Sequence, residues 1–321
     1  MIMNKRMFLQ LAFGCAALAV VANHVDADSA VFFNPYNTAQ IVDQSLIRHP
    51  TLASDSQEPV GVQLVLALDS SESMEPKEFE ISLRATADAL NSEQVRNAIK
   101  YKSGENSVAL AVISFDVFAM LRVPWVDIRG DEINDKPFDT ENLEKSSFSR
   151  DKLDRLADEI RALPRISSGG TSIDQALALG FSQFQKCAWP AIERKVLNVF
   201  GDGNSDTGKI QIQKKKLEQI GVTINGLAIV NEDPDLDQFY QTYLVTSGDT
   251  DKSGDGIYSQ RGRVWVAAQN MPLDNGTDVE LTAYYGSVVE AITKNISTEV
   301  AGTGFEYRNY AMNKKIFSLR F

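Results

Sequence analysis

The chain has 321 residues, of which 43% are hydrophobic and 23% charged, and its formal net charge at pH 7 is -11. This composition is typical of a folded protein and excludes an intrinsically disordered chain. The negative charge argues against nucleic acid or an anionic membrane surface as a partner, because both require a basic surface.

The first 27 residues have the layout of a secretory signal peptide. Lys5 and Arg6 precede an apolar run at 7–22, and Val25-Asp26-Ala27 is a plausible small-residue cleavage site. We therefore expect residues 1–27 to be removed and the mature protein to be exported, either to a periplasm or as a secreted protein, with no membrane span left after cleavage. An uncleaved N-terminal anchor is the competing interpretation.

Removal of this segment would leave Cys187 as the single cysteine and His49 as the single histidine. An internal disulfide bond is then impossible. Because only one histidine remains, a Ser-His-Asp catalytic triad and a histidine-rich zinc site are both disfavoured.

After an irregular leader segment at 28–60, the chain contains several runs that are apolar on both faces and rich in valine and isoleucine. Such runs are typical of strands that are covered by helices on each side of a sheet. The predicted strands cover residues 62–68, 107–115, 195–200 and 222–230, and a shorter one is expected at 263–267.

Amphipathic segments alternate with these strands. Apolar residues recur at helical spacing after Pro76, which suits the first turn of a helix, and Gly221 is a suitable residue to end another helix. The predicted helices begin at Pro76 and at Thr171 and cover residues 150–163, 210–220, 235–244 and 279–299.

This alternation predicts an α/β fold with a mostly parallel sheet. One connection is different, because only Asp116 to Phe118 separate the strand at 107–115 from the apolar run that follows. A helical crossover does not fit there, so the second run is expected to pair as an antiparallel hairpin at the edge of the sheet. The predicted fold class is α/β and doubly wound, with a mostly parallel sheet, one antiparallel edge strand and helices on both faces.

The regular pattern predicts one domain at 61–300, followed by a C-terminal tail at 301–321. The tail alternates loosely between polar and apolar residues. It is interpreted either as a docking strand for the sheet of another chain or as an ordinary packed terminus.

Oxygen-bearing side chains follow two of the predicted strands. Asp69, Ser71 and Ser73 follow the first strand, and Asp202 follows the strand at 195–200. If the strand order is 3-2-1-4-5-6, these strands are neighbours and their carboxyl ends meet where the order reverses. Thr171 lies in a Gly-Gly-Thr-Ser loop before a helix and is expected at the same place. The residues suit a small hard cation, although turns and helix N-caps use the same residue types.

The set Asp69-x-Ser71-x-Ser73, Thr171 and Asp202 resembles the metal-ion-dependent adhesion site of von Willebrand factor A (vWA) domains, in particular exported bacterial members of unassigned function. The resemblance covers residues 60 to 300. It implies that Ser71 and Ser73 coordinate the cation through their hydroxyls, with Thr171 bound directly or through water. It also implies that Asp69 and Asp202 act largely through bridging waters.

The cation implied by the resemblance is Mg²⁺, with Mn²⁺ or Ca²⁺ as alternatives. Mg²⁺ prefers six oxygen ligands, keeps several waters and needs few direct carboxylates. The resemblance also implies a protein partner that offers an acidic side chain to the cation. Glu72 adds negative charge at the rim of the site, which disfavours that acidic group.

A second oxygen-rich segment at 249–262 contains Asp251, Ser253 and Asp255 before Gly256, as in the first half of an EF-hand calcium loop. Gly262 stands where such a loop needs a bidentate glutamate. A solvated loop is the alternative interpretation of this segment.

The leading functional hypothesis is an exported binding module, not an enzyme, that engages a protein through a divalent cation. One alternative is a metal-dependent hydrolase of phosphoesterase type, for which Asp174 or Asp206 would have to act as the base. Another alternative is a scaffold in which the metal is purely structural.

Overall fold

The computed structural model of the protein describes residues 58–101, 106–138, 149–166, 169–230, 233–247, 261–267 and 278–301. The predicted signal peptide at 1–27, nearly all of the leader segment at 28–60 and the tail after 301 lie outside these residues. The predicted calcium-loop residues Asp251, Ser253 and Asp255 lie outside them as well.

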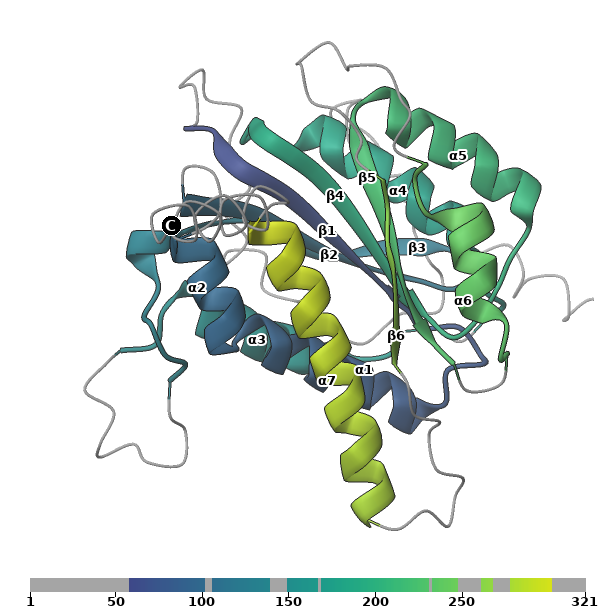
Figure 1. The fold of residues 1–321 in the computed structure, drawn as a ribbon, viewed down its shortest axis with the longest axis horizontal. Coiled ribbons are helices and arrows are strands. Elements are labelled where there is room, and N and C mark those ends of the chain that lie inside the picture. Colours follow the sequence, from purple (N-terminus) through teal and green to yellow (C-terminus); the bar gives the residue numbers. More distant parts are fainter. Residues whose placement is uncertain are drawn as a thin grey trace, which may run out of the picture. The chain divides into compact units, whose positions relative to one another are not determined.

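A single twisted sheet forms the centre of the fold (Figure 1). Its strand order is β3-β2-β1-β4-β5-β6, and β3 alone runs antiparallel to its neighbour. The strand order is the one on which the expected meeting of the strand ends depended, and the predicted antiparallel edge hairpin is confirmed. The strands are β1 (Val60–Asp69), β2 (Ser107–Phe115), β3 (Ala119–Arg129), β4 (Ala191–Gly201), β5 (Val222–Ile229) and β6 (Val264–Ala267).

The central strand β1 is buried along its whole length. It pairs with β2 on one side, where Asp69 lies opposite Phe115, and with β4 on the other, where Leu68 lies opposite Phe200. This register places the carboxyl ends of the three strands at one edge of the sheet, where ligands bind in open α/β folds.

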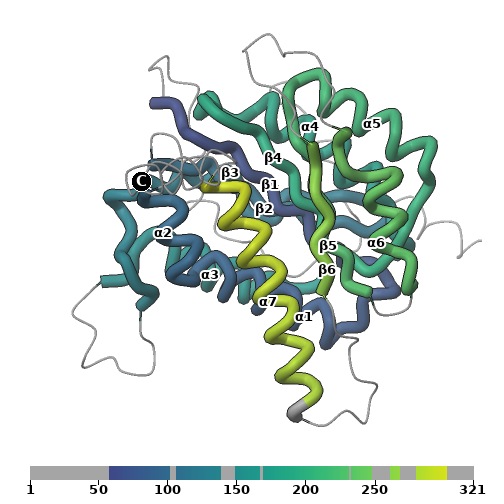
Figure 2. The backbone as a smooth tube through the Cα atoms, in the orientation of Figure 1, coloured from purple at the N-terminus to yellow at the C-terminus, as the bar shows by residue number. Residues whose placement is uncertain are grey.

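Helices cover both faces of the sheet, which explains why the strands are apolar on both sides (Figures 1 and 2). One core lies between the sheet and α1, α2, α3 and α7, and the other lies between the sheet and α4, α5 and α6. The helices are α1 (Pro76–Leu90), α2 (Glu93–Tyr101), α3 (Lys152–Arg161), α4 (Ile173–Lys186), α5 (Thr207–Gln219), α6 (Leu236–Phe239) and α7 (Asp278–Ala301).

The helices differ from the sequence-based prediction in three places. Helix α2 was not predicted; it is mostly polar, and its buried apolar residues are only Val95, Ala98 and Ile99. Helix α4 begins at Ile173 and not at Thr171, whose hydroxyl faces another loop. The segment expected as one helix at 235–244 is the short α6 followed by a π-helical turn, η4 (Tyr240–Leu244).

Gly221 follows α5 with a φ of 76°, a left-handed conformation that favours glycine. The prediction that this residue ends the helix is therefore confirmed.

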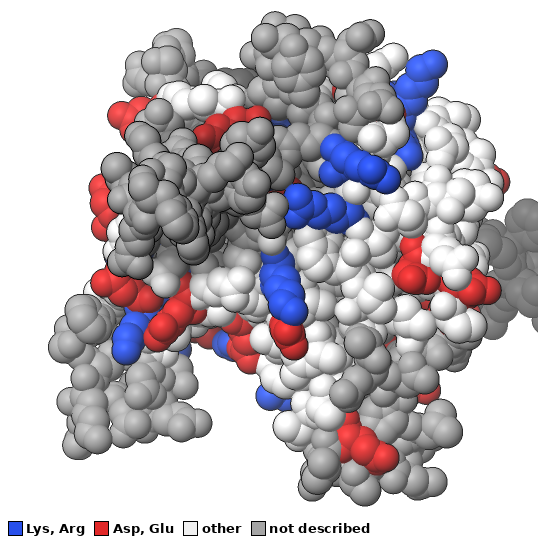
Figure 3. Space-filling view, viewed as in Figure 1, with Lys and Arg blue, Asp and Glu red and all other residues white. Residues whose placement is uncertain are grey.

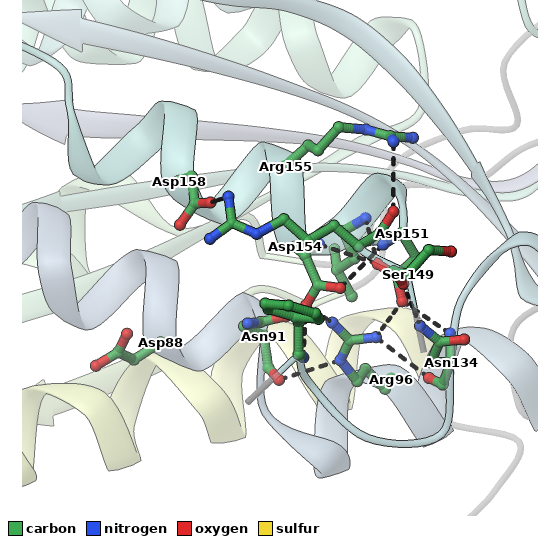
Figure 4. A network of polar contacts seen from close by, with 12 residues as sticks. Asp88, Asn91, Arg96, Asn134, Ser149, Asp151, Asp154, Arg155 and Asp158 are labelled. Atoms are coloured by element: carbon green, nitrogen blue, oxygen red, sulfur yellow. Dashed lines mark hydrogen bonds and ion pairs between the residues drawn. The ribbon is translucent and has the colours of Figure 1, made fainter. Parts of the chain in front are cut away.

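Arg96 joins α2 to the beginning of α3 (Figure 4). Its guanidinium forms ion pairs of 2.6 Å with both Asp151 and Asp154, and it also donates to the backbone carbonyl oxygens of Asn91 and Asn134 at 3.2 Å. Burial alone would raise the pKa of Asp151, but the hydrogen bonds from Arg96 and two backbone N–H groups hold that pKa below its ordinary value. This buried cluster fixes the position of α3 against α2.

Charged side chains are mixed on the face shown in Figure 3. Basic side chains lie mainly in a diagonal band across α7 and β6, and acidic side chains are scattered to either side of it. Among the described residues visible on this face, the acidic side chains are not gathered into one region.

Candidate metal centre

The structure brings together all five residues predicted for the first site, at the carboxyl ends of β1 and β4. Ser71 Oγ lies 3.0 Å from both Ser73 Oγ and Thr171 Oγ1. The Ser73 hydroxyl donates to Asp202 Oδ1 at 2.8 Å, and the Ser71 N–H donates to Asp69 Oδ1 at 2.8 Å. The five side chains thus form one continuous polar cluster drawn from three separate loops.

The loop after β1 is shaped by backbone contacts with its neighbours. The N–H and the hydroxyl of Ser70 both donate to the carbonyl oxygen of Phe115, at 2.8 and 3.1 Å, and the N–H of Glu72 donates to that of Gly169 at 2.7 Å. The hydroxyl of Ser70 is therefore directed away from the cluster, and the Glu72 side chain is exposed. These two residues behave as the spacers that the alternating motif requires.

One carboxylate oxygen in the cluster lacks a hydrogen-bond partner. Asp69 is only 1% exposed, and its Oδ2 atom is buried without a hydrogen-bond partner. Burying such an oxygen without a partner costs free energy. The pKa of Asp69 is raised from 3.8 to about 7, mainly by burial and also by the charges of Asp202 and Asp116, although hydrogen bonds from Ser71 lower it. A cation beside this carboxylate would supply the missing partner, so the residues fit one.

Two glycines keep the space around the cluster open. A Cβ atom built on Gly203 would lie 2.5 Å from Thr171 Oγ1, and one built on Gly201 would lie 2.6 Å from Asp69 Oδ2. Both distances are far inside van der Waals contact. Any larger residue at these positions would push the threonine hydroxyl or the aspartate carboxylate out of place.

Asp116 positions the Thr171 loop, and the sequence analysis assigned it only to a hairpin turn. Its carboxylate accepts hydrogen bonds from the N–H groups of Phe118 at 2.9 Å and Gly169 at 3.3 Å, and its carbonyl oxygen accepts one from the N–H of Ser172 at 3.0 Å. It follows β2 directly, and Asp69 is the last residue of β1. The position of Asp116 as a third aspartate at a strand end could have indicated from the sequence that it belongs to the site.

Arg165 and Tyr240 also support the loops. The Arg165 guanidinium donates to the carbonyl oxygen of Ser70 at 3.3 Å and to that of Ser71. The fully buried Tyr240 hydroxyl donates to the carbonyl oxygen of Gly203 at 3.4 Å, while its ring packs on Gly226. No local sequence pattern predicts the contacts of Arg165 or of Tyr240.

Glu78, one turn into α1, is a further buried acid near the cluster. The Tyr284 hydroxyl of α7 donates to its Oε1 atom at 2.9 Å. Burial and then the charge of Asp202 raise the pKa of Glu78 from 4.5 to about 7, against the effect of the Tyr284 hydrogen bond. The end of the sheet therefore holds two acids, Asp69 and Glu78, whose pKa is raised by burial.

Comparison with protein families gave a model that matches residues 59–250, more than half of the chain, with the description "Protein of unknown function (DUF1194)". The chain belongs to this family. The matched residues of this DUF1194 protein include all five residues of the polar cluster. Comparison with the curated proteins gave no match.

Among solved structures, the DUF1194 protein is similar to a von Willebrand factor type A protein from Catenulispora acidiphila, with 13% identity and a TM-score of 0.42 over 76% of this chain and 43% of that one. It is similar to the hypothetical protein BatB from Bacteroides thetaiotaomicron, with 15% identity and a TM-score of 0.37 over 75% of this chain and all of that one. A third similar structure is proximal thread matrix protein 1 from the mussel byssus with a zinc-occupied MIDAS motif, with 13% identity and a TM-score of 0.40 over 74% of this chain and 47% of that one.

The DUF1194 chain spans less than half the length of the first solved structure that it matches. The strand order and the antiparallel edge strand confirm the predicted doubly wound α/β fold class.

The described residues contain no group of three or more His, Cys, Asp or Glu side chains that could hold a metal ion. Within the same residues, no helix has the length and apolar character needed to span a bilayer.

Proposed function

We propose that Ser71, Ser73, Thr171, Asp69 and Asp202 hold one divalent cation, Mg²⁺ or else Mn²⁺ or Ca²⁺. We further propose that the chain is an exported module that binds an acidic side chain of a partner protein through this cation. The observation that carries the proposal is the contact chain from Thr171 through Ser71 and Ser73 to Asp202, next to the unpartnered Oδ2 atom of Asp69.

The chemistry of these residues supports the proposal. Hydroxyl and carboxylate oxygens are the ligands that hard divalent cations prefer. Three of the five residues are neutral, so a bound cation retains a strong attraction for one further anionic ligand. Ser73 and Thr171 are partly exposed, which leaves a route for a side chain from outside. This access favours a binding site over a purely structural metal.

The described residues do not favour a hydrolase. Asp206 caps α5 by accepting the N–H of Lys209 at 3.1 Å, and Asp174 accepts a hydrogen bond from the Gln175 side chain at 3.1 Å. Asp206 therefore has the contact of an N-cap residue, and Asp174 lies in the first turn of α4. We propose no catalytic step.

Capture of a partner is expected to require both the cation and the Thr171 hydroxyl. The immobilised protein is incubated with extract of its source organism in Mg²⁺ or EDTA, and each captured protein is identified, purified and tested again. We expect at least a tenfold loss of capture in EDTA and in Thr171→Val, which keeps the side-chain shape but loses one ligand oxygen.

Thr171→Ser is the matched control, because it keeps the hydroxyl, and it is expected to retain capture. Circular dichroism of all three proteins confirms that the fold is unchanged. Capture that persists undiminished in EDTA, or with Thr171→Val, would contradict the proposal.

A further inference from the structure

Large apolar side chains are exposed beside the candidate metal centre. Phe118, in the turn between β2 and β3, is 70% exposed. Four other side chains nearby in the fold are 39–43% exposed, and we call the five together the apolar corner: Val117, Phe118, Met120, Leu121 and Ile166. Met120 and Leu121 are successive residues of β3 and point to opposite faces of the sheet, so the corner wraps around the strand beside the turn. Exposed apolar groups that lie together mark interaction surfaces more often than single ones do.

The apolar corner is held rigidly and is continuous with the metal centre. The carboxylate of Asp116 accepts the N–H of Phe118, within the turn, and that of Gly169, in the loop that carries Thr171. A Cβ atom on Gly169 would lie 3.0 Å from a Val117 methyl group, so the turn packs directly on that loop. The same carboxylate therefore fixes the exposed Phe118 turn and the loop of a cation ligand.

The connection between α3 and α4, which carries Ile166, contacts both β3 and the Asp69–Ser73 loop of the metal centre. Arg122 on β3 donates to the carbonyl oxygen of Pro164 at 2.7 Å, two residues before Ile166. The neighbouring Arg165 donates to the carbonyl oxygens of Ser70 and Ser71. The exposed Ile166 thus follows a residue that contacts the Asp69–Ser73 loop.

Strand β3 is the last strand of the sheet on its side. Met120 and Leu121 pair with Ser114 and Ile113 of β2, and their other edge has no strand beside it within the described residues. An extended segment of another protein is able to add to such an edge. Pro124 has no N–H and limits this pairing to the part of β3 nearest the metal centre.

We infer that the apolar corner is a second contact for the partner that reaches the cation, and that this partner carries a bulky apolar side chain within a few residues of its acidic one. This inference rests on the proposed function. The choice of occupant follows from the contacts of Asp116 and Gly169, which join the Phe118 turn to the loop that carries Thr171, so a single partner is placed to touch both. The net charge of -11 disfavours an anionic membrane as the occupant.

The test uses an array of nine-residue Gly/Ser peptides as the probe, and the purified full chain as the binder. Each peptide has one Asp at its centre and one Phe or Leu at a spacing of one to four residues on either side, which spans up to about 13 Å. Companion peptides lack the apolar residue or have Asn for Asp. Binding is measured in Mg²⁺ and in EDTA.

In Mg²⁺ the wild-type protein is expected to bind Asp peptides with an apolar residue at a favoured spacing about tenfold better than Asp peptides without one. Phe118→Ser is expected to reduce this preference to the Asp-only level while leaving the dependence on Asp and on Mg²⁺. The matched control Ile212→Ser removes an apolar side chain that is 59% exposed on α5, and it is expected to change nothing.

The other outcomes overturn the inference in distinguishable ways. Mg²⁺-dependent binding of Asp peptides with no preference for an apolar neighbour, or a preference that survives in Phe118→Ser, contradicts this inference alone. Apolar binding that ignores Asp and Mg²⁺, or no binding at all, contradicts the proposed function together with it. A dimer that Phe118→Ser converts to a monomer in sedimentation would instead make the corner a self-association surface.

Discussion

In the absence of divalent cations, the free energy of unfolding is expected to fall as the pH rises from 4 to 8. The pKa of Asp69 is raised from 3.8 to about 7 in the folded protein, because burial disfavours its charge. The folded state therefore keeps a proton that the unfolded chain loses above pH 4, and the stabilisation disappears as the pH passes 7. A difference of about 3 pKa units corresponds to about 4 kcal/mol.

A bound cation is expected to remove most of this fall, because it favours the ionised carboxylate and competes with the proton. Urea unfolding at pH 5, 6, 7 and 8, in EDTA and in Mg²⁺, measures the effect. Asp69→Asn has no proton to lose there, so its stability in EDTA is expected to depend less on pH than that of the wild type. Equal pH dependence in the two proteins, or a fall that Mg²⁺ leaves unchanged, would contradict this account.

Glu78 is expected to add to the same pH dependence, since burial also raises its pKa from 4.5 to about 7. Its stabilisation is present below pH 4.5 and is lost as the pH passes 7. Glu78→Gln separates its contribution from that of Asp69.

Replacing Arg96 by methionine is expected to destabilise the protein by about 3–5 kcal/mol. The Arg96 side chain is fully buried and pairs with Asp151 and Asp154, which are 8% and 3% exposed. Its removal would leave two buried carboxylates without their cation, which is the costly way to break a buried ion pair. The corresponding loss in melting temperature is roughly 10 °C for a domain of this size.

Two variants control this experiment. Arg155→Met changes an exposed arginine of α3 whose guanidinium donates to one backbone carbonyl oxygen, and it is expected to cost less than about 0.5 kcal/mol. Arg96→Lys keeps the charge but not the planar fork of donors, so it is expected to recover only part of the loss. If Arg96→Met unfolds at the same urea concentration as Arg155→Met, the cluster does not stabilise the fold.

The sheet was predictable because its strands are continuous apolar runs, a pattern that survives without knowledge of the tertiary structure. Helix α2 was not predictable in this way. Its buried Arg96 forms ion pairs with Asp151 and Asp154, which lie more than fifty residues later in the chain. The local sequence around Arg96 is mostly polar and does not indicate a buried helix.

The same contrast holds at the candidate centre. Asp69, Ser71, Ser73 and Asp202 follow strands directly, so the expected strand order was enough to bring them together. Arg165 was not predictable, because it acts on backbone carbonyl groups that lie about 95 residues earlier in the chain. The support that holds the loops in place is tertiary, whereas the proposed ligands carry a local signal.

The central claim is that hydroxyl and carboxylate oxygens from three loops surround one divalent cation. Titration with Mn²⁺, followed by electron paramagnetic resonance, measures this binding directly and needs no partner. Three variants are compared with the wild type: Thr171→Val, Gly203→Ala and Gly208→Ala. Gly208 is an exposed residue in the first turn of α5, where a Cβ atom would lie 3.3 Å from Asp206 Oδ1 and far less tightly than one on Gly203 lies against Thr171.

The wild type is expected to bind a Mn²⁺ ion. Thr171→Val and Gly203→Ala are expected to lower the affinity for Mn²⁺ by about tenfold or more, since the first removes a ligand oxygen and the second displaces it. Gly208→Ala is expected to bind as the wild type does. Absence of Mn²⁺ binding by the wild type, or equal binding by all four proteins, would contradict the claim.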